Sequence, residues 1–143
     1  MSDFPDDFGM QTFSSLGKGV TVTGQVTVNA GLTDTVVLIE GKGSIYGGSL
    51  VIDTSAETGS SAYNVLVDGD SIFNETLSNL LLYRVGVAYE DVMKLQVYDK
   101  LRGLFVATLQ RGITYITSFK VEFVNAVASA VAVTYRITYA SVE

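Results

Sequence analysis

The stretch Val131-Ala132-Val133-Thr134-Tyr135-Arg136-Ile137-Thr138-Tyr139-Ala140 decides the fold, because a large apolar side chain occupies every second position along it. A period of two places one set of side chains on each face of a β-strand. The stretch Phe119-Lys120-Val121-Glu122-Phe123 alternates in the same way. The carboxyl-terminal third therefore predicts two strands that each bury one face, and that burial fixes the register in which they pair.

The same alternation continues toward the amino terminus. Val20, Val22, Val26 and Val28 alternate with polar residues, and further short apolar runs are separated by turns rich in glycine, asparagine and aspartate. We count eight or nine strands at a spacing of roughly 8–12 residues, with no alternating helices that would indicate a parallel sheet. This pattern predicts an all-β fold, an antiparallel two-sheet sandwich of the jelly-roll kind, as a single domain over residues 17–143.

Three local features refine this prediction. Gly47-Gly48 interrupts a strand and predicts a bulge, or a bend where the strand leaves one sheet for the other. Asp68-Gly69-Asp70 lies between two β-rich runs and predicts a hairpin, since Asp and Gly tolerate the positive φ of a type I′ turn. Residues 74–82 are expected to form either one short helix or an irregular crossing loop, because three leucines there have helical spacing, namely Leu77, Leu80 and Leu81.

Residues 1–16 show no sustained period and predict an extended arm. Such an arm is either a frayed terminus or a segment whose aromatic side chains dock on a neighbour. Three phenylalanines are more than a solvated tail requires. We therefore name Phe4, Phe8 and Phe13 as the candidate residues for contact with another subunit.

Composition excludes several classes of partner. Fifteen acidic and nine basic side chains give a net charge of −6, the wrong sign for holding phosphate backbones, so no nucleic acid is expected. No stretch approaches the roughly 20 apolar residues of a spanning helix, so no membrane is expected either. The acidic start does not match a secretory signal. Hydrophobic residues nevertheless make up 48% of the chain, which indicates a core plus a subunit interface.

Catalytic chemistry finds little support in the sequence. Neither histidine nor cysteine occurs, which removes the commonest general base and the thiolate nucleophiles and ligands. Ser15-Leu16-Gly17-Lys18 has the Ser-x-x-Lys spacing of penicillin-recognising enzymes without their companion motifs. Gly41-Lys42-Gly43-Ser44 lacks the remaining glycine and the helix of a P-loop, and is interpreted as a tight turn. We predict no catalytic residue, no cofactor and no enzyme activity.

Acidic side chains offer two further alternatives. Asp68-Gly69-Asp70 could begin a calcium loop, but the third ligand position is Ile72 and the position of the bidentate Glu is Asn79. Glu90 and Asp91 could pair with Asp68 as the two carboxylates of a glycosidase, at a separation that sequence does not give. The hairpin explains the first pattern without a metal, and we predict no metal site.

Sugar binding without catalysis is an alternative that stays open. Lectin-like sandwiches stack aromatic rings on sugars, and this chain has eight tyrosines but no tryptophan. Tyr63, Tyr135 and Tyr139 lie in strand patterns, where a place in the core or an interface is the default. This function would need an exposed tyrosine cluster at one end of the sandwich.

Four strings of strand and turn residues, Gly43–Asp53, 66–73, 119–123 and 131–139, resemble small β-sandwich proteins of tailed-phage particles. They are most similar to the capsid decoration, or cement, group. The resemblance implies a jelly-roll-like subunit, often a trimer, that sits on the outside of the shell and reinforces it, with an arm that reaches neighbours. It transfers no functional residue.

These observations together predict a structural protein of a phage particle. It would be made in the host cytoplasm and located in the virion, would form a homo-oligomer, expected to be a trimer, and would bind the major capsid protein or another virion protein. Phe4, Phe8 and Phe13 are the candidate contacts. A carbohydrate- or receptor-binding module is the alternative.

Overall fold

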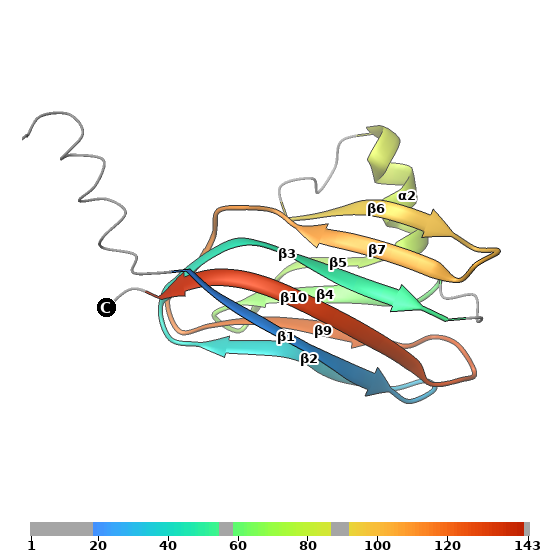
Figure 1. Ribbon diagram of the computed structural model, residues 1–143, viewed down its shortest axis with the longest axis horizontal. Coiled ribbons are helices and arrows are strands. Elements are labelled where there is room, and N and C mark those ends of the chain that lie inside the picture. The colour runs from blue at the N-terminus through green and yellow to red at the C-terminus, as the bar shows by residue number, and fades with distance from the viewer. Residues whose placement is uncertain (1–18, 55–58, 87–91, 142–143) are drawn as a thin grey trace, which may run out of the picture.

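The computed structural model describes residues 19–54, 59–86 and 92–141, and within these ranges it has ten strands and one helix (Figure 1). The strands are β1 (Gly19–Val28), β2 (Thr33–Glu40), β3 (Gly43–Asp53), β4 (Ala62–Val67), β5 (Asp70–Thr76), β6 (Met93–Asp99), β7 (Leu104–Leu109), β8 (Ile113–Tyr115), β9 (Ser118–Val124) and β10 (Val131–Ser141). The helix is α2 (Leu77–Gly86). In the described part, no helix is long and apolar enough to cross a membrane. The strand β8, three residues long, has no counterpart in the strands that the sequence predicts.

The strands form two antiparallel sheets packed face to face. The wide sheet has the order β1-β10-β3-β7-β6, with β8 paired to one end of β3, and the narrow sheet has the order β2-β9-β4-β5. The pairings are nested, since β1 pairs with β10, β2 with β9, β3 with β7 and β8, and β4 with β5. Nested pairing wound over two sheets is the jelly-roll arrangement, so the predicted antiparallel sandwich is confirmed.

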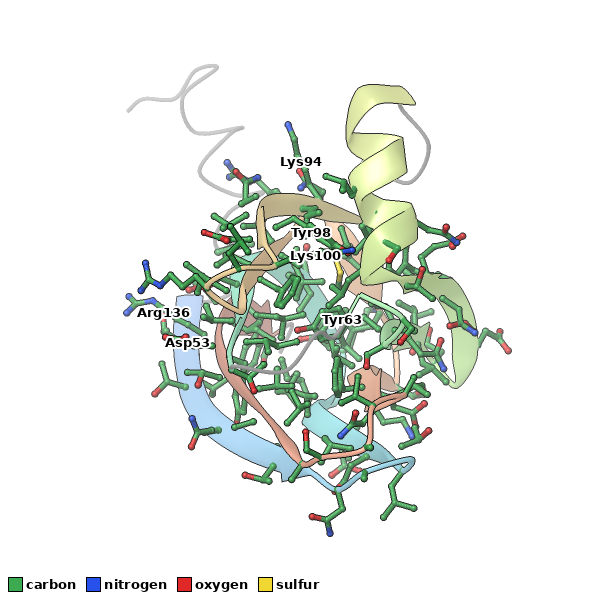
Figure 2. The ribbon with its side chains drawn as sticks, turned by 90° about the vertical axis from the view of Figure 1, so that its right-hand side faces the viewer. Asp53, Tyr63, Lys94, Tyr98, Lys100 and Arg136 are labelled. Carbon is green, nitrogen blue, oxygen red and sulfur yellow. The ribbon has the colours of Figure 1, made fainter. Side chains whose placement is uncertain are left out.

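The strand that decides the fold, β10, lies between β1 and β3 in the wide sheet. Val133 and Ile137 are fully buried, whereas Thr134 and Arg136 are exposed. Figure 2 shows Arg136 at the outer side of the molecule and Tyr63 between the sheets. The period of two therefore separates core from solvent, as predicted.

The core lies between the sheets and combines aromatic and aliphatic residues from both. Phe119 and Phe123 of β9 are fully buried, as is Leu50 of β3. The ring of Tyr63, on β4, packs on Phe123 with 5.3 Å between ring centroids. Aromatic pairs at this separation contribute about 1 kcal/mol beyond the burial of their surface.

Strand β3 bends at its glycine pair but stays in one sheet. Its register with β10 shifts between Thr138 and Tyr139, which lie opposite Gly47 and Ile45, so the predicted bulge is present. The alternative, a move to the second sheet, was wrong, because both halves of β3 pair within the wide sheet. Glycine is needed at position 48 because the β10 backbone lies close to β3 there. A Cβ at Gly48 would lie 2.9 Å from the carbonyl oxygen of Arg136.

The segment 74–82 is divided between a strand and a helix. Strand β5 continues to Thr76, and α2 begins at the next residue. The Thr76 hydroxyl accepts a hydrogen bond from the backbone N–H of Asn79 at 3.1 Å, which is the bond of a helix N-cap. Leu77 and Leu80 are buried and Leu81 is 36% exposed, so two of the three predicted leucines anchor the helix to the core.

Candidate interaction surfaces

The outer face of the narrow sheet carries a row of apolar side chains across its strands. Leu38 of β2 and Leu66 of β4 flank Lys120 of β9, which pairs with both. Leu66 in turn pairs with Ser71 of β5, and the following residue, Ile72, is the extra residue of a bulge. Leu38 is 50% exposed and Ile72 is 39% exposed. We call Leu38, Leu66 and Ile72 the apolar row.

A polar network lies beside the apolar row. Glu122 forms an ion pair with Lys120 at 3.4 Å and accepts a hydrogen bond from the Asn64 amide at 3.1 Å. The Asn64 carbonyl oxygen accepts a hydrogen bond from the Ser71 hydroxyl at 2.6 Å. These bonds hold the side chains around the row in fixed positions. The outer face therefore combines exposed apolar side chains with ordered polar ones, and Lys120 stands between Leu38 and Leu66.

The carboxylate of Asp68 binds the turn at one end of this face. Its Oδ1 accepts hydrogen bonds from the backbone N–H groups of Ile116 (2.9 Å), Thr117 (2.6 Å) and Ser118 (3.1 Å), and from the Thr117 hydroxyl (3.0 Å). These donors stabilise the charged form, the N–H of Thr117 most, and lower the pKa of Asp68 from its ordinary 3.8 to about 2. The clamp fixes the turn that presents Ile116, which is 67% exposed.

The turn at Asp68 is the predicted hairpin between β4 and β5. Asp68 has φ 54° and Gly69 has φ 86°, as a type I′ turn requires. The interpretation of Gly41-Lys42-Gly43-Ser44 as a tight turn is also confirmed, since Gly41 has φ 106° and a strand, not a helix, follows it. In the described ranges, no group of three or more acidic side chains is placed to hold a metal ion.

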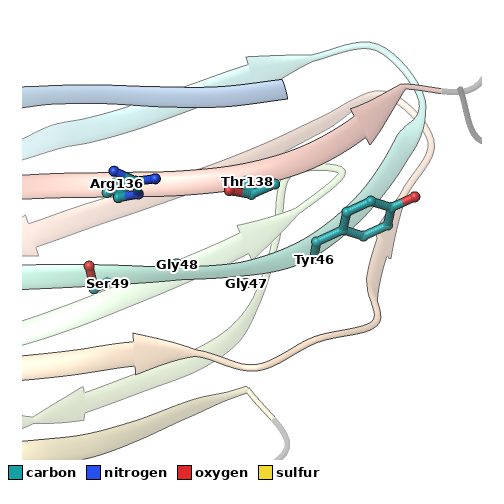
Figure 3. Close-up of a pocket in the computed structure, with 6 residues that line it drawn as sticks. All are labelled: Tyr46, Gly47, Gly48, Ser49, Arg136 and Thr138. Carbon is teal, nitrogen blue, oxygen red and sulfur yellow. The ribbon is translucent and has the colours of Figure 1, made fainter. Parts of the chain in front are cut away.

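A shallow depression of about 290 Å³ lies on the outer face of the wide sheet, between β3 and β10 (Figure 3). A side chain at Gly47 would meet no atom within 4 Å, so this glycine leaves open space there. The guanidinium of Arg111 lies 5.9 Å from the ring centroid of Tyr46 at one border. The lining offers one positive charge and several hydroxyl groups but no carboxylate, so it lacks a pair of groups for acid–base chemistry. The lining residues are Tyr46, Gly47, Gly48, Ser49, Arg136 and Thr138.

The tyrosines singled out for sugar binding do not form an exposed cluster. Tyr63 is 1% exposed in the core, and burial raises the pKa of its hydroxyl. Tyr135 and Tyr139 are half-buried and pack against the core from β10. The default interpretation, a place in the core or an interface, is therefore confirmed for Tyr63 as a core residue, whereas Tyr135 and Tyr139 lie at the margin of the core.

Several candidate residues lie outside the described part of the chain. These are the arm residues Phe4, Phe8 and Phe13, the Ser15 and Lys18 pair, and the acids Glu90 and Asp91. The arm contact therefore stays a prediction, and the carboxylate pair stays an untested alternative.

The sequence pattern does not predict the apolar row, and the reason is physical. Leu38 stands in the run Val36-Val37-Leu38-Ile39, which has no alternation and indicates a strand buried on both faces. A bulge at Val36 buries both Val36 and Val37 and leaves Leu38 on the outside. Bulges become visible only when the pairing partner is known.

No protein-family model matches the sequence. No curated protein matches it either. Among solved structures, the infectious bursal disease virus VP2 subviral particle is similar at 19% identity and a TM-score of 0.48, over 87% of this chain and 32% of that one. The capsid of the Helicobacter pylori bacteriophage KHP30 is similar at 13% identity and a TM-score of 0.46, over 86% of this chain and 91% of that one. The capsid asymmetric unit of the cyanophage Pam1 gives 18% identity and a TM-score of 0.46, over 86% and 84%. The chain thus spans about a third of the VP2 chain and most of the two phage chains.

Proposed function

We propose that this chain is a structural protein of a virus particle, of the capsid decoration or cement type, which stabilises the shell through many protein–protein contacts. Its partners are the major capsid protein or another virion protein, and further copies of itself in a trimer. It is made in the host cytoplasm and becomes part of the virion. The apolar row on the outer face of the narrow sheet is the observation that carries this proposal.

The apolar row suits a protein contact in which each single interaction is weak and many copies together bind strongly. Leu38 and Ile72 leave 50% and 39% of their surface in water, and the ordered polar side chains of Asn64, Lys120 and Glu122 lie on the strands between them. Exposed apolar patches with a polar rim mark protein interaction sites. Because a shell repeats its surface many times, subunits that are linked to one another bind it with an avidity that exceeds each single contact.

Two further observations support the proposal. The pattern of strand and turn residues in the sequence resembles that of the capsid decoration proteins. Asp68 also holds the turn that carries Ile116, a further exposed apolar side chain. A surface that keeps its shape before binding loses less entropy on binding.

The proposal is tested with particles of the virus that encodes the chain, grown with this gene deleted. Purified chain is added, and the bound fraction is measured by sedimentation with the particles. We expect the chain to bind in repeated copies and to raise the temperature at which the particles release their genome. The variant Leu38→Asp should bind about tenfold more weakly, because a carboxylate in the apolar row must lose its water when the surface binds.

The matched control is Leu101→Asp, the same change at another exposed leucine, in the turn between β6 and β7. It should bind like the natural chain. A combined variant, Phe4→Ala with Phe8→Ala and Phe13→Ala, tests the arm, and it should also bind more weakly. Particles that take up no chain, or equal binding by the two aspartate variants, would contradict the proposal.

A further inference from the structure

Each sheet of the sandwich ends in two edge strands, and these four strands are not alike. The wide sheet ends in β1 and β6, and the narrow sheet ends in β2 and β5. One side of an edge strand presents N–H and C=O groups that have no strand to pair with. Natural proteins protect such edges with charges, prolines, bulges or short length, because an unprotected edge pairs with other chains.

Three of the four edges carry this protection. Each of β2, β5 and β6 contains a bulge, and β6 also contacts α2. Each also contains two charged residues, which are Asp34 and Glu40 in β2, Asp70 and Glu75 in β5, and Lys94 and Asp99 in β6. These edges are built to stay unpaired.

The fourth edge, β1, has none of these devices. Its ten residues, Gly-Val-Thr-Val-Thr-Gly-Gln-Val-Thr-Val, include no charge and no proline. All ten pair with β10 in one unbroken register, so the strand contains no bulge. Figure 1 shows it along the border of the wide sheet, and among the described strands it pairs with β10 alone. It is a long, regular and uncharged edge, the form that adds a strand from another chain.

The inner side of β1 is also incompletely covered. Val20 pairs with Tyr139, which packs against the core, so its side chain belongs to the inner face. It is nevertheless 44% exposed, and Val22 and Val26 are half-buried. A strand added beside β1 would cover these valines as well as the backbone.

The side chains of β1 match a second copy of the same strand. On its outer face, Thr21 lies 2.8 Å from the Thr138 hydroxyl and Gln25 donates to the Thr134 hydroxyl at 3.0 Å, so this face already forms polar cross-strand pairs. In an antiparallel self-pairing that keeps the faces aligned, the outer residues meet threonine, glutamine or glycine, and the inner residues meet valine or Gly24. No like charges oppose each other, because the strand has none. A symmetric contact of this kind closes as a dimer.

We propose that β1 pairs antiparallel with β1 of a second copy, which joins two wide sheets into one continuous sheet across a two-fold axis. This contact differs from the three-fold contact expected within a trimer, and it would link one trimer to the next. It also uses a surface other than the apolar row.

The register of the pairing can be tested with cysteine, because the chain contains none. Four full-length variants each carry one change on the outer face of β1, namely Thr21→Cys, Thr23→Cys, Gln25→Cys or Thr27→Cys. In a two-fold pair, a step of two residues from the axis separates the two copies of a position by roughly 14 Å more. A disulfide needs Cα atoms within about 7 Å. We therefore expect oxidation to cross-link one position alone when the axis lies at an outer residue. When the axis lies at an inner residue, only a mixture of the two variants on either side of it should cross-link.

The strength of the contact is measured by sedimentation equilibrium of the full chain. Thr23→Lys protects the edge with a charge, and it should weaken self-association about tenfold. Thr114→Lys, at an exposed threonine of β8, is the matched control and should associate like the natural chain. Circular dichroism confirms that each variant is folded.

Three results would overturn this inference: a chain that stays monomeric at high concentration, equal weakening by Thr23→Lys and Thr114→Lys, or cysteines in β1 that cross-link equally or, alone and in mixtures, not at all. The assay contains no viral shell. A chain that fails to bind particles can therefore still pass it, and the two proposals fail separately.

Discussion

Asp68 joins parts of the chain that lie 48 to 50 residues apart. Its carboxylate replaces the partner strand that the N–H groups of Ile116, Thr117 and Ser118 would otherwise need, since each backbone donor seeks an acceptor. The residue has φ 54°, a conformation that Asp and Asn tolerate better than most residues. One exposed side chain thus fixes both the hairpin between β4 and β5 and the turn before β9.

Asp68→Asn should make the protein less stable at neutral pH and should change its response to acid. The folded-state pKa of about 2 lies below the ordinary 3.8, so the charged carboxylate stabilises the fold above pH 4 and loses that effect as the pH falls through 2. Urea unfolding midpoints of the natural chain and the variant should therefore differ at pH 7 and converge near pH 2. Asp70→Asn, at the other side of the same turn, is the control. A difference that is independent of pH would contradict this assignment.

Tyr63→Phe should stabilise the protein. The Tyr63 hydroxyl is buried and has no hydrogen-bond partner among the described residues, so it loses its water without replacement. Removal of such a group should raise the free energy of unfolding by about 1 kcal/mol, measured by urea titration. The ring contact with Phe123 stays. Tyr98→Phe is the control, because its hydroxyl lies 3.4 Å from that of Ser78 and it should show no gain. A loss of stability in Tyr63→Phe would mean that the hydroxyl has a partner.

At the scale of elements, β3 pairs with three other strands of the wide sheet. It pairs with β10 on one side and with β7 and then β8 on the other. The change of partner falls at the glycine pair, where the bulge turns the strand. The depression on the outer face lies at the same place. The bend, the change of partner and the depression thus coincide at Gly47 and Gly48.

Gly48→Ala should destabilise the fold by about 1–3 kcal/mol, the usual cost of overpacking. The added methyl group would lie 2.9 Å from both the Arg136 carbonyl oxygen and the Ile137 side chain, and backbone cannot move aside cheaply. Thermal unfolding monitored by circular dichroism measures the effect. Ser49→Ala, one residue further along β3, should change stability little. Equal stability of the two variants would show that β3 and β10 can separate without cost.

The elements also show what sequence can predict. Alternation located the strongly one-sided strands, β1, β9 and β10, because one buried face leaves a period of two. It missed β8, since three residues hold too little of a period, and it missed the outward direction of Leu38, since a bulge hid it. The sequence already shows that β1 has no charged residues, unlike the other edge strands. This difference can be interpreted only when the strand order shows which strands are edges.

At the scale of the whole molecule, the two proposed contacts use different sides of the sandwich. The apolar row lies on the outer face of the narrow sheet, and the β1 edge borders the wide sheet. One subunit can therefore face a shell and touch a neighbour at the same time. On the outer surface of the wide sheet, Thr21 pairs with Thr138 and Gln25 bonds to Thr134 between β1 and β10.

The nested pairing also sets the order of events during synthesis. Strand β1 is the first of the described strands to be made, and its partner β10 is the last. Pairing across 117 residues, as between Thr21 and Thr138, must wait until all the strands between them have been made. During that wait β1 is an uncharged strand with both sides open, among nascent chains of the same sequence. The neutrality that suits it to assembly therefore makes the yield of folded protein fall as its rate of production rises.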